Sequence, residues 1–154
     1  MIDLYEELAS VIKELRSEAV EHALCGALAL AVHGVPRATK DLNILVRKED
    51  EAALRRAVRR AGYVLEALPM EFASGVEMQR FTKLIEGRPL MLDILWAKGA
   101  LLPIWERREK FAWREGEIDV VSRDDLITLK LTAGRPQDLV DVQSLAALEG
   151  PRGK

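Results

Sequence analysis

A segment that is apolar on every side lies near the start of the chain, at residues 27–32. It reads ALALAV, follows Gly26 and ends before Gly34 and Pro36. Because a helix without a polar face has to be buried, we predict a short helix inside the domain that begins at Gly26. The peptide N–H groups and the partial positive charge at that end would suit a phosphate group.

Polar and apolar residues then alternate from Asp41 to Val46. Asp41 and Asn43 are two positions apart, so they share one face of a strand, and the apolar residues between and after them share the other. Two oxygen-bearing side chains beside a helix end that favours anions indicate a metal-nucleotide site. The alternative is a strand edge whose polar side chains cap a neighbouring helix.

A third acid, Asp93, interrupts the apolar segment 90–96. In a strand it shares one face with Met91 and Leu95. An acid there is costly to bury unless it has a cation or a partner. Asp93 is therefore either a metal ligand or the partner of a buried arginine or lysine.

The remaining pattern predicts five more helices and further strands around these segments. Asp3 and Ser122 are placed to cap two of the helices, and in the last helix Leu139, Val142, Leu145 and Ala146 are expected to face inward. We expect helices over residues 4–15, 48–61, 101–110, 123–133 and 136–148, a turn that leads into a strand over 18–24, strands over 63–68, 76–85, 90–96, 111–114 and 117–121, and a turn at 86–89.

The composition of the 154-residue chain fits one globular domain, residues 1–150, with a loose tail at 151–154. Hydrophobic residues make up 49%, charged residues 31%, and the net charge is −2, which argues against a protein that grips nucleic acid over its whole surface. One cysteine, Cys25, excludes an intrachain disulfide. No apolar run reaches the roughly 20 residues that span a membrane, so we expect a cytoplasmic protein. The oligomeric state does not follow from the sequence.

The order of several polar motifs resembles the nucleotidyltransferase superfamily with the DNA-polymerase-beta-like fold. Within it, the chain is similar to small bacterial nucleotidyltransferases related to the AbiEii-type toxins of toxin–antitoxin systems. The resemblance extends from about residue 21 to 148 and implies an α+β fold, a mixed sheet flanked by helices with a helical pair at the C-terminus. The motifs are Gly26-Ala27, Arg37-x-Thr39-x-Asp41-Leu42-Asn43, Leu92-Asp93-Ile94, Lys130 and Arg135-x-x-Asp138-x-x-Asp141.

This resemblance implies a site that uses Mg²⁺ or Mn²⁺ and a nucleoside triphosphate. The metal would be held by Asp41, Asn43 and Asp93, and the nucleotidyl group would pass to an acceptor on a tRNA, a protein or a small molecule. The expected nucleotide-binding residues are Gly26 and Ala27 in the triphosphate turn, Arg37 and Thr39 in the loop before the first acid, Lys130 at the phosphates, and Arg135, Asp138 and Asp141 near the nucleotide.

Two residues depart from the family pattern. Ala27 replaces a glycine or serine, which removes a hydroxyl contact to phosphate, and Asn43 replaces an aspartate, which removes a charge. Three explanations stay open for Asn43: an enzyme with looser metal binding, a decayed enzyme that still binds nucleotide, or an engineered inactive form. A small α/β scaffold whose acids are structural is a further reading.

Other polar residues have a structural reading beside a functional one. Lys130 is either a phosphate ligand or part of a solvated helix face, and the last helix carries either nucleotide ligands or a surface ladder at i, i+3 spacing. His22 and His33 lack a second metal ligand at a useful spacing, so we expect structural histidines. The arginines Arg55, Arg56, Arg59 and Arg60 form either a solvated face, with Glu51 paired to Arg55, or a patch that tracks the phosphates of an RNA acceptor.

Overall fold

The computed structural model describes residues 2–36, 39–114 and 116–148. Within these ranges eight strands form one mixed sheet in the order β3-β5-β6-β2-β1-β8-β7, with β4 also paired to β5. The strands are β1 (Ala23–Cys25), β2 (Asp41–Val46), β3 (Leu65–Glu66), β4 (Met70–Glu71), β5 (Glu77–Ile85), β6 (Arg88–Trp96), β7 (Glu109–Trp113) and β8 (Gly116–Val120).

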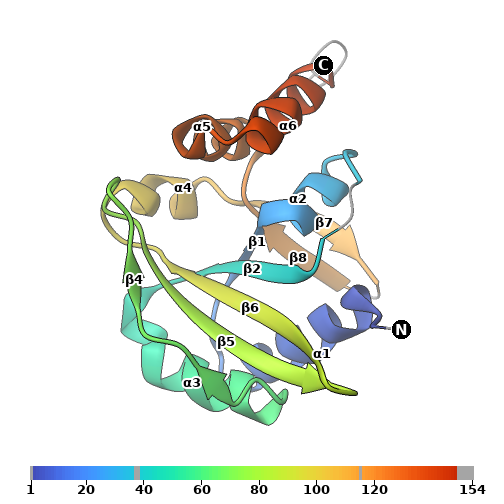
Figure 1. Cartoon of the computed structure of the whole chain (residues 1–154), viewed down its shortest axis with the longest axis vertical. Helices are drawn as coiled ribbons and strands as arrows, with labels where there is room; N and C mark the ends of the chain where they lie inside the picture. The colour runs from blue at the N-terminus through green and yellow to red at the C-terminus, as the bar shows by residue number, and fades with distance from the viewer. Residues whose placement is uncertain (1, 37–38, 115, 149–154) are drawn as a thin grey trace.

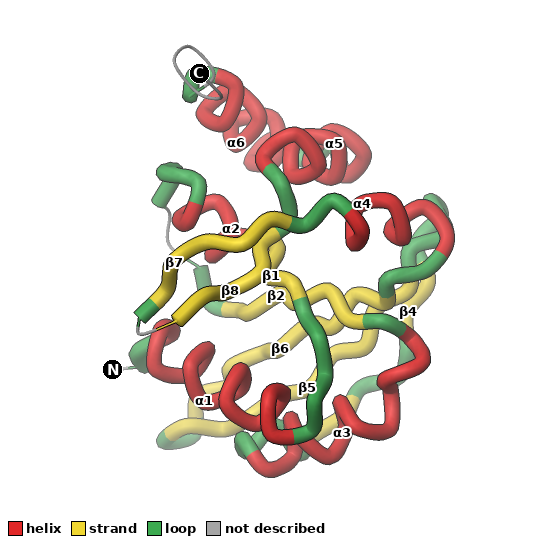
Figure 2. Tube along the Cα trace, turned by 180° about the vertical axis from the view of Figure 1, so that it is seen from behind, coloured by secondary structure: helices red, strands yellow, loops and turns green. Residues whose placement is uncertain are grey.

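The helices cover both sides of this sheet and add a pair at the C-terminus. Helices α1 and α3 lie on one side, and α2 and the C-terminal pair lie on the other (Figure 1; Figure 2 from behind). They are α1 (Leu4–Ser17), α2 (Gly26–Val32), α3 (Glu51–Arg60), α4 (Leu102–Glu106), α5 (Arg123–Ala133) and α6 (Pro136–Ala146), with 3₁₀ turns η1 (Lys48–Asp50) and η2 (Gly99–Leu101). This is the expected α+β architecture, a mixed sheet flanked by helices with a helical pair at its end.

Helix ends follow the expected capping chemistry. The Asp3 carboxylate accepts the N–H groups of Tyr5 and Glu6 at the start of α1, and the Ser122 hydroxyl accepts the N–H of Asp125 at the start of α5. Gly134 ends α5 in the left-handed conformation, with φ +67°.

One face of the central strand β2 packs into the apolar core, and the other face carries polar side chains. Its residues Leu42, Ile44 and Val46 are buried, and α1 packs over this side through Leu8 and Ile12. Apolar burial of this extent is the main source of stability in a domain of this size. The opposite side of β2 carries the polar positions and faces α2.

Three predicted boundaries were wrong. The segment 63–68 forms only the short strand β3, followed by β4. The turn after β5 is confined to Glu86 and Gly87, with φ values of 51° and 78°, so Arg88 and Pro89 already belong to β6. Pro89 is tolerated because β2 pairs with β6 only from Met91 onward.

The helix expected over 101–110 ends at Glu106. Residues Glu109 and Lys110 instead pair with Val120 and Asp119 and begin β7.

The inward face of the last helix also differs from the prediction. Leu139 and Ala146 are exposed, whereas Leu145 is buried together with Asp138 and Asp141. The helix is turned so that two acids face the domain, because cations on α5 and at the start of α6 neutralise them there.

Candidate functional site

Four side chains from four neighbouring strands form a row across the sheet. In register, Cys25 on β1 is paired with Asn43 on β2, Asn43 with Asp93 on β6, and Asp93 with Arg80 on β5. Asp41 lies two positions before Asn43 on β2 and therefore on the same face. The strand pairing thus brings together the three residues expected to form the metal site.

Gly26 connects this row to α2. It has φ +70°, and a Cβ built on it would lie 2.5 Å from the Asn43 Nδ2 atom. The Asn43 side chain therefore packs directly against the backbone of Gly26. Ala27, the next residue, is buried. Only glycine satisfies both the positive φ and the close approach.

Replacing Gly26 with alanine should lower the free energy of unfolding by about 3 kcal/mol, because left-handed strain and a steric clash add together. Gly134→Ala is the matched control: its φ is +67°, but the nearest atom to a new Cβ is 3.7 Å away. The control should lose only about 1 kcal/mol. Urea unfolding of both variants measures the difference, and equal losses would show that the contact with Asn43 is easily relieved.

Asp41 stands at the entrance of β2 and is half-buried. The Thr39 hydroxyl donates a hydrogen bond of 2.8 Å to its Oδ1 atom. Arg37, the other loop residue predicted to bind nucleotide, lies outside the described residues. The negative charge of Asp41 contributes to raising the pKa of Arg80 on β5 and of Arg135 at the start of α6.

Asp93 is held by an arginine. The Arg80 Nε and Nη2 atoms donate to Oδ1 and Oδ2 of Asp93 over 2.7 Å and 3.0 Å. The hydrogen bond to Asp93 raises the pKa of Arg80, and the charges of Asp93 and Asp41 raise it further. Asp93 thus has the arginine partner that one of the two alternatives required, although the Arg80 side chain is 37% exposed rather than buried. Arg80 is a site residue that the sequence did not reveal.

Lys130 on α5 is largely buried between the two acids of α6. Its Nζ atom lies 3.3 Å from Oδ1 of Asp138 and 3.2 Å from Oδ2 of Asp141, and both acids are buried. Arg135 donates from Nε to Asp138 over 2.7 Å while its side chain stays 73% exposed. Lys130 is therefore not part of a solvated face. Arg135 and Asp138 do form an ion pair at the expected i, i+3 spacing, but Asp138 and Asp141 are buried and not on the surface.

Helix α5 contacts α2, the helix that begins at Gly26 beside the strand row. Burial and, to a smaller extent, the charge of Asp93 raise the pKa of the Cys25 thiol to about 12 against the opposing charge of Lys130. The pKa of Arg135 is raised first by its hydrogen bond to Asp138, with a smaller contribution from Asp41. Charges from β2, β6, α5 and α6 therefore act on one region.

The carboxyl of Asp138 makes stability depend on acid pH. Its hydrogen bond from Arg135 lowers its pKa from 3.8 to about 2. A lowered folded-state pKa stabilises the protein above the unfolded value, so about 2 kcal/mol should be present at pH 5 and lost as the pH falls from about 4 to about 2. Urea unfolding at these pH values measures the loss. In Asp138→Asn the free energy of unfolding should fall less steeply over the same pH interval. An unchanged slope would mean that other acids cause the loss of stability.

The oxygen atoms of the strand row suit a metal ion that takes only a few of its ligands from the protein. Within the described ranges, no three His, Cys, Asp or Glu side chains come together as a metal cluster. Asp41 and Asp93 supply carboxylates, and Asn43 can supply an amide oxygen. Magnesium is often bound by one or two carboxylates together with substrate phosphates, so the set fits one ion carried with a nucleotide.

The other candidate residues have structural roles. His22 and His33 hydrogen-bond the backbone carbonyls of Val20 and Val121. Each arginine of the α3 face has a carboxylate partner. The pairs are Arg55 with Glu51 and Glu66, Arg56 with Glu18, Arg59 with Glu66, and Arg60 with Glu14 and Glu18.

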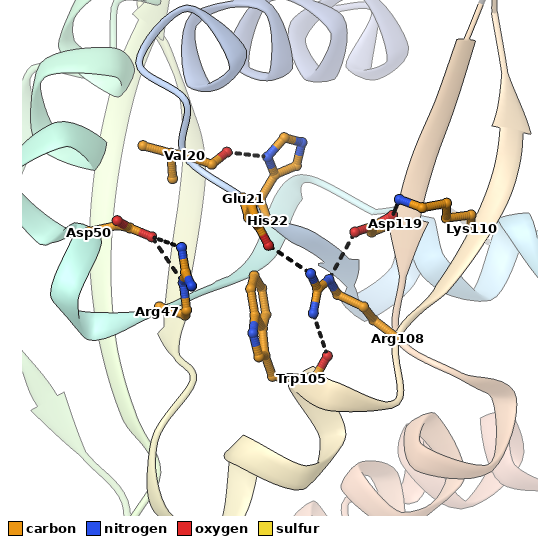
Figure 3. A network of polar contacts seen from close by, with 9 residues as sticks. All are labelled: Val20, Glu21, His22, Arg47, Asp50, Trp105, Arg108, Lys110 and Asp119. Atoms are coloured by element: carbon orange, nitrogen blue, oxygen red, sulfur yellow. Dashed lines mark hydrogen bonds and ion pairs between the residues drawn. The ribbon is translucent and has the colours of Figure 1, made fainter.

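A second polar cluster links the segment between α1 and β1 to the β7–β8 hairpin (Figure 3). Arg108 stacks over the Trp105 ring at 4.0 Å and forms ion pairs with Glu21 and Asp119, and Lys110 also pairs with Asp119. These charges neutralise one another. We interpret the cluster as a structural tie between α4 and the β7–β8 hairpin.

The comparisons with known proteins agree with this architecture. No protein-family description and no curated protein match the chain. A candidate nucleotidyltransferase from Thermotoga maritima superposes with a TM-score of 0.68, with 16% identity and coverage of 96% of both chains. The chain has the nucleotidyltransferase fold.

Two antibiotic-modifying proteins share this nucleotidyltransferase fold. The lincosamide antibiotic adenylyltransferase LnuA with lincomycin bound gives a TM-score of 0.62 at 13% identity, covering 93% of this chain and 96% of that one. The protein ANT(2″)-Ia in complex with adenylyl-2″-tobramycin gives 0.61 at 15% identity, covering 94% and 88%. No helix in the described part of the chain is long and apolar enough to cross a membrane.

Proposed function

We propose that this chain binds a nucleoside triphosphate at the row of Asp41, Asn43 and Asp93 and transfers its nucleotidyl group to a hydroxyl of a small molecule. The observation that carries this proposal is the meeting of these three residues beside Gly26 in a nucleotidyltransferase fold, with Lys130 on the helix that contacts α2. The acceptor oxygen would bond to the α-phosphorus as the bond to pyrophosphate breaks, and the hydroxyl would lose its proton.

The row would hold one Mg²⁺ or Mn²⁺ ion through oxygens of Asp41, Asn43 and Asp93. Such an ion neutralises the charge that develops on the phosphates and the leaving pyrophosphate. Lys130 and Arg135 add positive charge beside this region, and Thr39 fixes the rotamer of Asp41. Asp138 and Asp141 would act on the nucleotide indirectly, by holding Lys130 and Arg135 in place.

A small-molecule acceptor is favoured over RNA by the charges of the surface. An RNA-binding surface needs cations that are free to meet phosphates, and the arginines of α3 are already paired with carboxylates. The neighbours support the same choice, since LnuA was solved with lincomycin and ANT(2″)-Ia with an adenylylated tobramycin.

A nucleotide-binding module without transfer activity is the second candidate. Asn43 removes one carboxylate from the row, and Arg80 occupies both oxygens of another. Both features weaken the attraction for a divalent ion. Such a module would bind nucleotide and act as a sensor or as the partner of another subunit.

Label transfer from each α-labelled nucleoside triphosphate separates the two candidates. The purified chain is incubated with Mg²⁺ and, in separate reactions, an aminoglycoside, a lincosamide and bulk tRNA. The proposed enzyme labels a small molecule. Binding of a nucleotide without labelled product, with transfer gained in Asn43→Asp, supports the second candidate instead, and labelled tRNA would overturn the choice of acceptor.

The resemblance to AbiEii-type toxins leads to a proposal about cellular role. We propose that the protein acts in the cytoplasm as the toxin of a toxin–antitoxin pair. Induced expression should then arrest growth, and Asp41→Asn should abolish the arrest. Normal growth at high expression of the wild-type protein would count against this role without affecting the proposed chemistry.

A further inference from the structure

Arg80 neutralises a carboxylate that the sheet has buried. The Asp93 side chain is 4% exposed, and both its oxygens accept hydrogen bonds from the same guanidinium, whereas the Arg80 side chain is 37% exposed. A buried carboxylate without a cation is strongly destabilising. Arg80 therefore supplies the positive charge that Asp93 requires when no metal or nucleotide is present.

Two other cations of the region that the structure describes already have carboxylate partners. Lys130 lies between Asp138 and Asp141, and Arg135 is hydrogen-bonded to Asp138. Arg80 is the cation that contacts Asp93, and the charge of Asp41 also raises the pKa of Arg80. A divalent ion can bind the Asp93 oxygens only if the guanidinium leaves at least one of them.

We propose that Arg80 is a positioning residue that makes metal binding at Asp93 conditional on the nucleotide. This inference rests on the proposed function. In the nucleotide-free protein the guanidinium holds Asp93 and keeps free metal out. The negative charge of an arriving triphosphate gives the exposed guanidinium another partner, and Asp93 becomes available to the metal that the nucleotide carries.

Manganese binding measures this competition without any turnover. Mn²⁺ is titrated into the wild type, Arg80→Gln and Lys83→Gln, and free Mn²⁺ is followed by electron paramagnetic resonance. Lys83 is the matched control, because it also lies on β5 but pairs with Glu7 of α1. Without nucleotide, Arg80→Gln should bind Mn²⁺ at least about tenfold more tightly than the wild type, since a nearby positive charge is gone. Lys83→Gln should bind as the wild type does.

The dependence of metal binding on the nucleotide is tested by repeating the Mn²⁺ titration with a non-hydrolysable nucleoside triphosphate. Nucleotide should tighten Mn²⁺ binding more in the wild type than in Arg80→Gln, so the two affinities converge. Equal Mn²⁺ affinities in the absence of nucleotide would overturn the role of Arg80 while leaving the proposed function standing. Failure of the wild type to bind Mn²⁺ even with every nucleotide would overturn both.

Thermal unfolding gives a second measure of Mn²⁺ binding that remains informative if Arg80→Gln is less stable than the wild type. The variant should melt at a lower temperature than the wild type and recover with Mn²⁺, whereas Mn²⁺ alone should leave the wild type unchanged. If Arg80→Gln does not fold, Arg80→Lys retains the charge with fewer contacts and should bind Mn²⁺ more tightly than the wild type. The double variant Arg80→Gln/Asp93→Asn should fold without gaining Mn²⁺ affinity, and a gain would overturn the proposal.

Discussion

Asp41→Asn should reduce nucleotidyl transfer by about a thousandfold while the protein stays folded. Asp41 is half-buried, and the amide oxygen of asparagine can still accept the hydrogen bond from Thr39. The substitution leaves Asp93 as the single carboxylate of the row. Loss of metal-borne charge stabilisation amounts to several kcal/mol in the transition state, and each 1.36 kcal/mol is a factor of ten in rate. Initial rates of label transfer measure the effect.

Asn43→Asp is the opposite change at the neighbouring position and serves as the comparison. It adds the missing carboxylate, so transfer at low Mg²⁺ should rise by about tenfold. Without metal, three adjacent carboxylates repel one another, and the melting temperature should fall until Mg²⁺ is added. A normal rate in Asp41→Asn, or a lower rate in Asn43→Asp at every Mg²⁺ concentration, would contradict the assignment of these two residues.

Lys130→Met should lower the free energy of unfolding by about 3–5 kcal/mol. The Lys130 side chain is 12% exposed and its ammonium neutralises Asp138 and Asp141, whose side chains are 0% and 3% exposed. Removal of a cation from a buried ion pair leaves uncompensated charge in the interior, at about this cost. Urea unfolding measures the loss, and hydrogen exchange should show it first in α5 and α6.

Lys110→Met is the matched surface change for this prediction. Its side chain is 67% exposed and pairs with Asp119 at 3.0 Å. Exposed pairs contribute about 1 kcal/mol or less, so the control should remain close to the wild type. If Lys130→Met lowered the free energy of unfolding as little as Lys110→Met does, water would have to reach Asp138 and Asp141. That result would refute the tight packing of α6 against α5.

The β2 strand and the buried helix were predictable because their patterns are local. Strict alternation places Asp41 and Asn43 on one face, and a helix without a polar side follows Gly26. The apolar face of β2 and the buried α2 then appear where expected. The meeting of Asn43 with Asp93 was expected from the family resemblance, and parallel pairing of β2 with β6 produces it.

Arg80 was missed because strand register depends on the length of a turn. A turn over residues 86–89 would place Thr82 opposite Asp93, whereas a two-residue turn at Glu86-Gly87 places Arg80 there. The positive φ of both turn residues is typical of the tight hairpin turns that favour glycine. If a two-residue hairpin turn had been assigned to Glu86-Gly87 in the sequence, the resulting register would have placed Arg80 opposite Asp93.

The orientation of α6 was not predictable from its apolar residues alone. The apolar pattern favours Leu139 and Ala146 inside, but ion pairing with Lys130 and Arg135 turns Asp138 and Asp141 inward. The Lys130 pairs join residues of two helices and Arg135 is the N-cap residue that precedes α6, so the apolar periodicity within α6 does not reveal these contacts. Leu139 is left 48% exposed as a result.

Calorimetric titration of each nucleoside triphosphate, with and without Mg²⁺, tests the central claim that the Asp41–Asn43–Asp93 row is a nucleotide site. At least one nucleotide should bind the wild type in the presence of Mg²⁺, with a Kd between about 1 μM and 1 mM. Asp41→Asn should weaken this binding at least about tenfold, and Lys83→Gln should leave it unchanged. No heat from any nucleotide with the folded wild-type protein, or equal binding by Asp41→Asn, would contradict it.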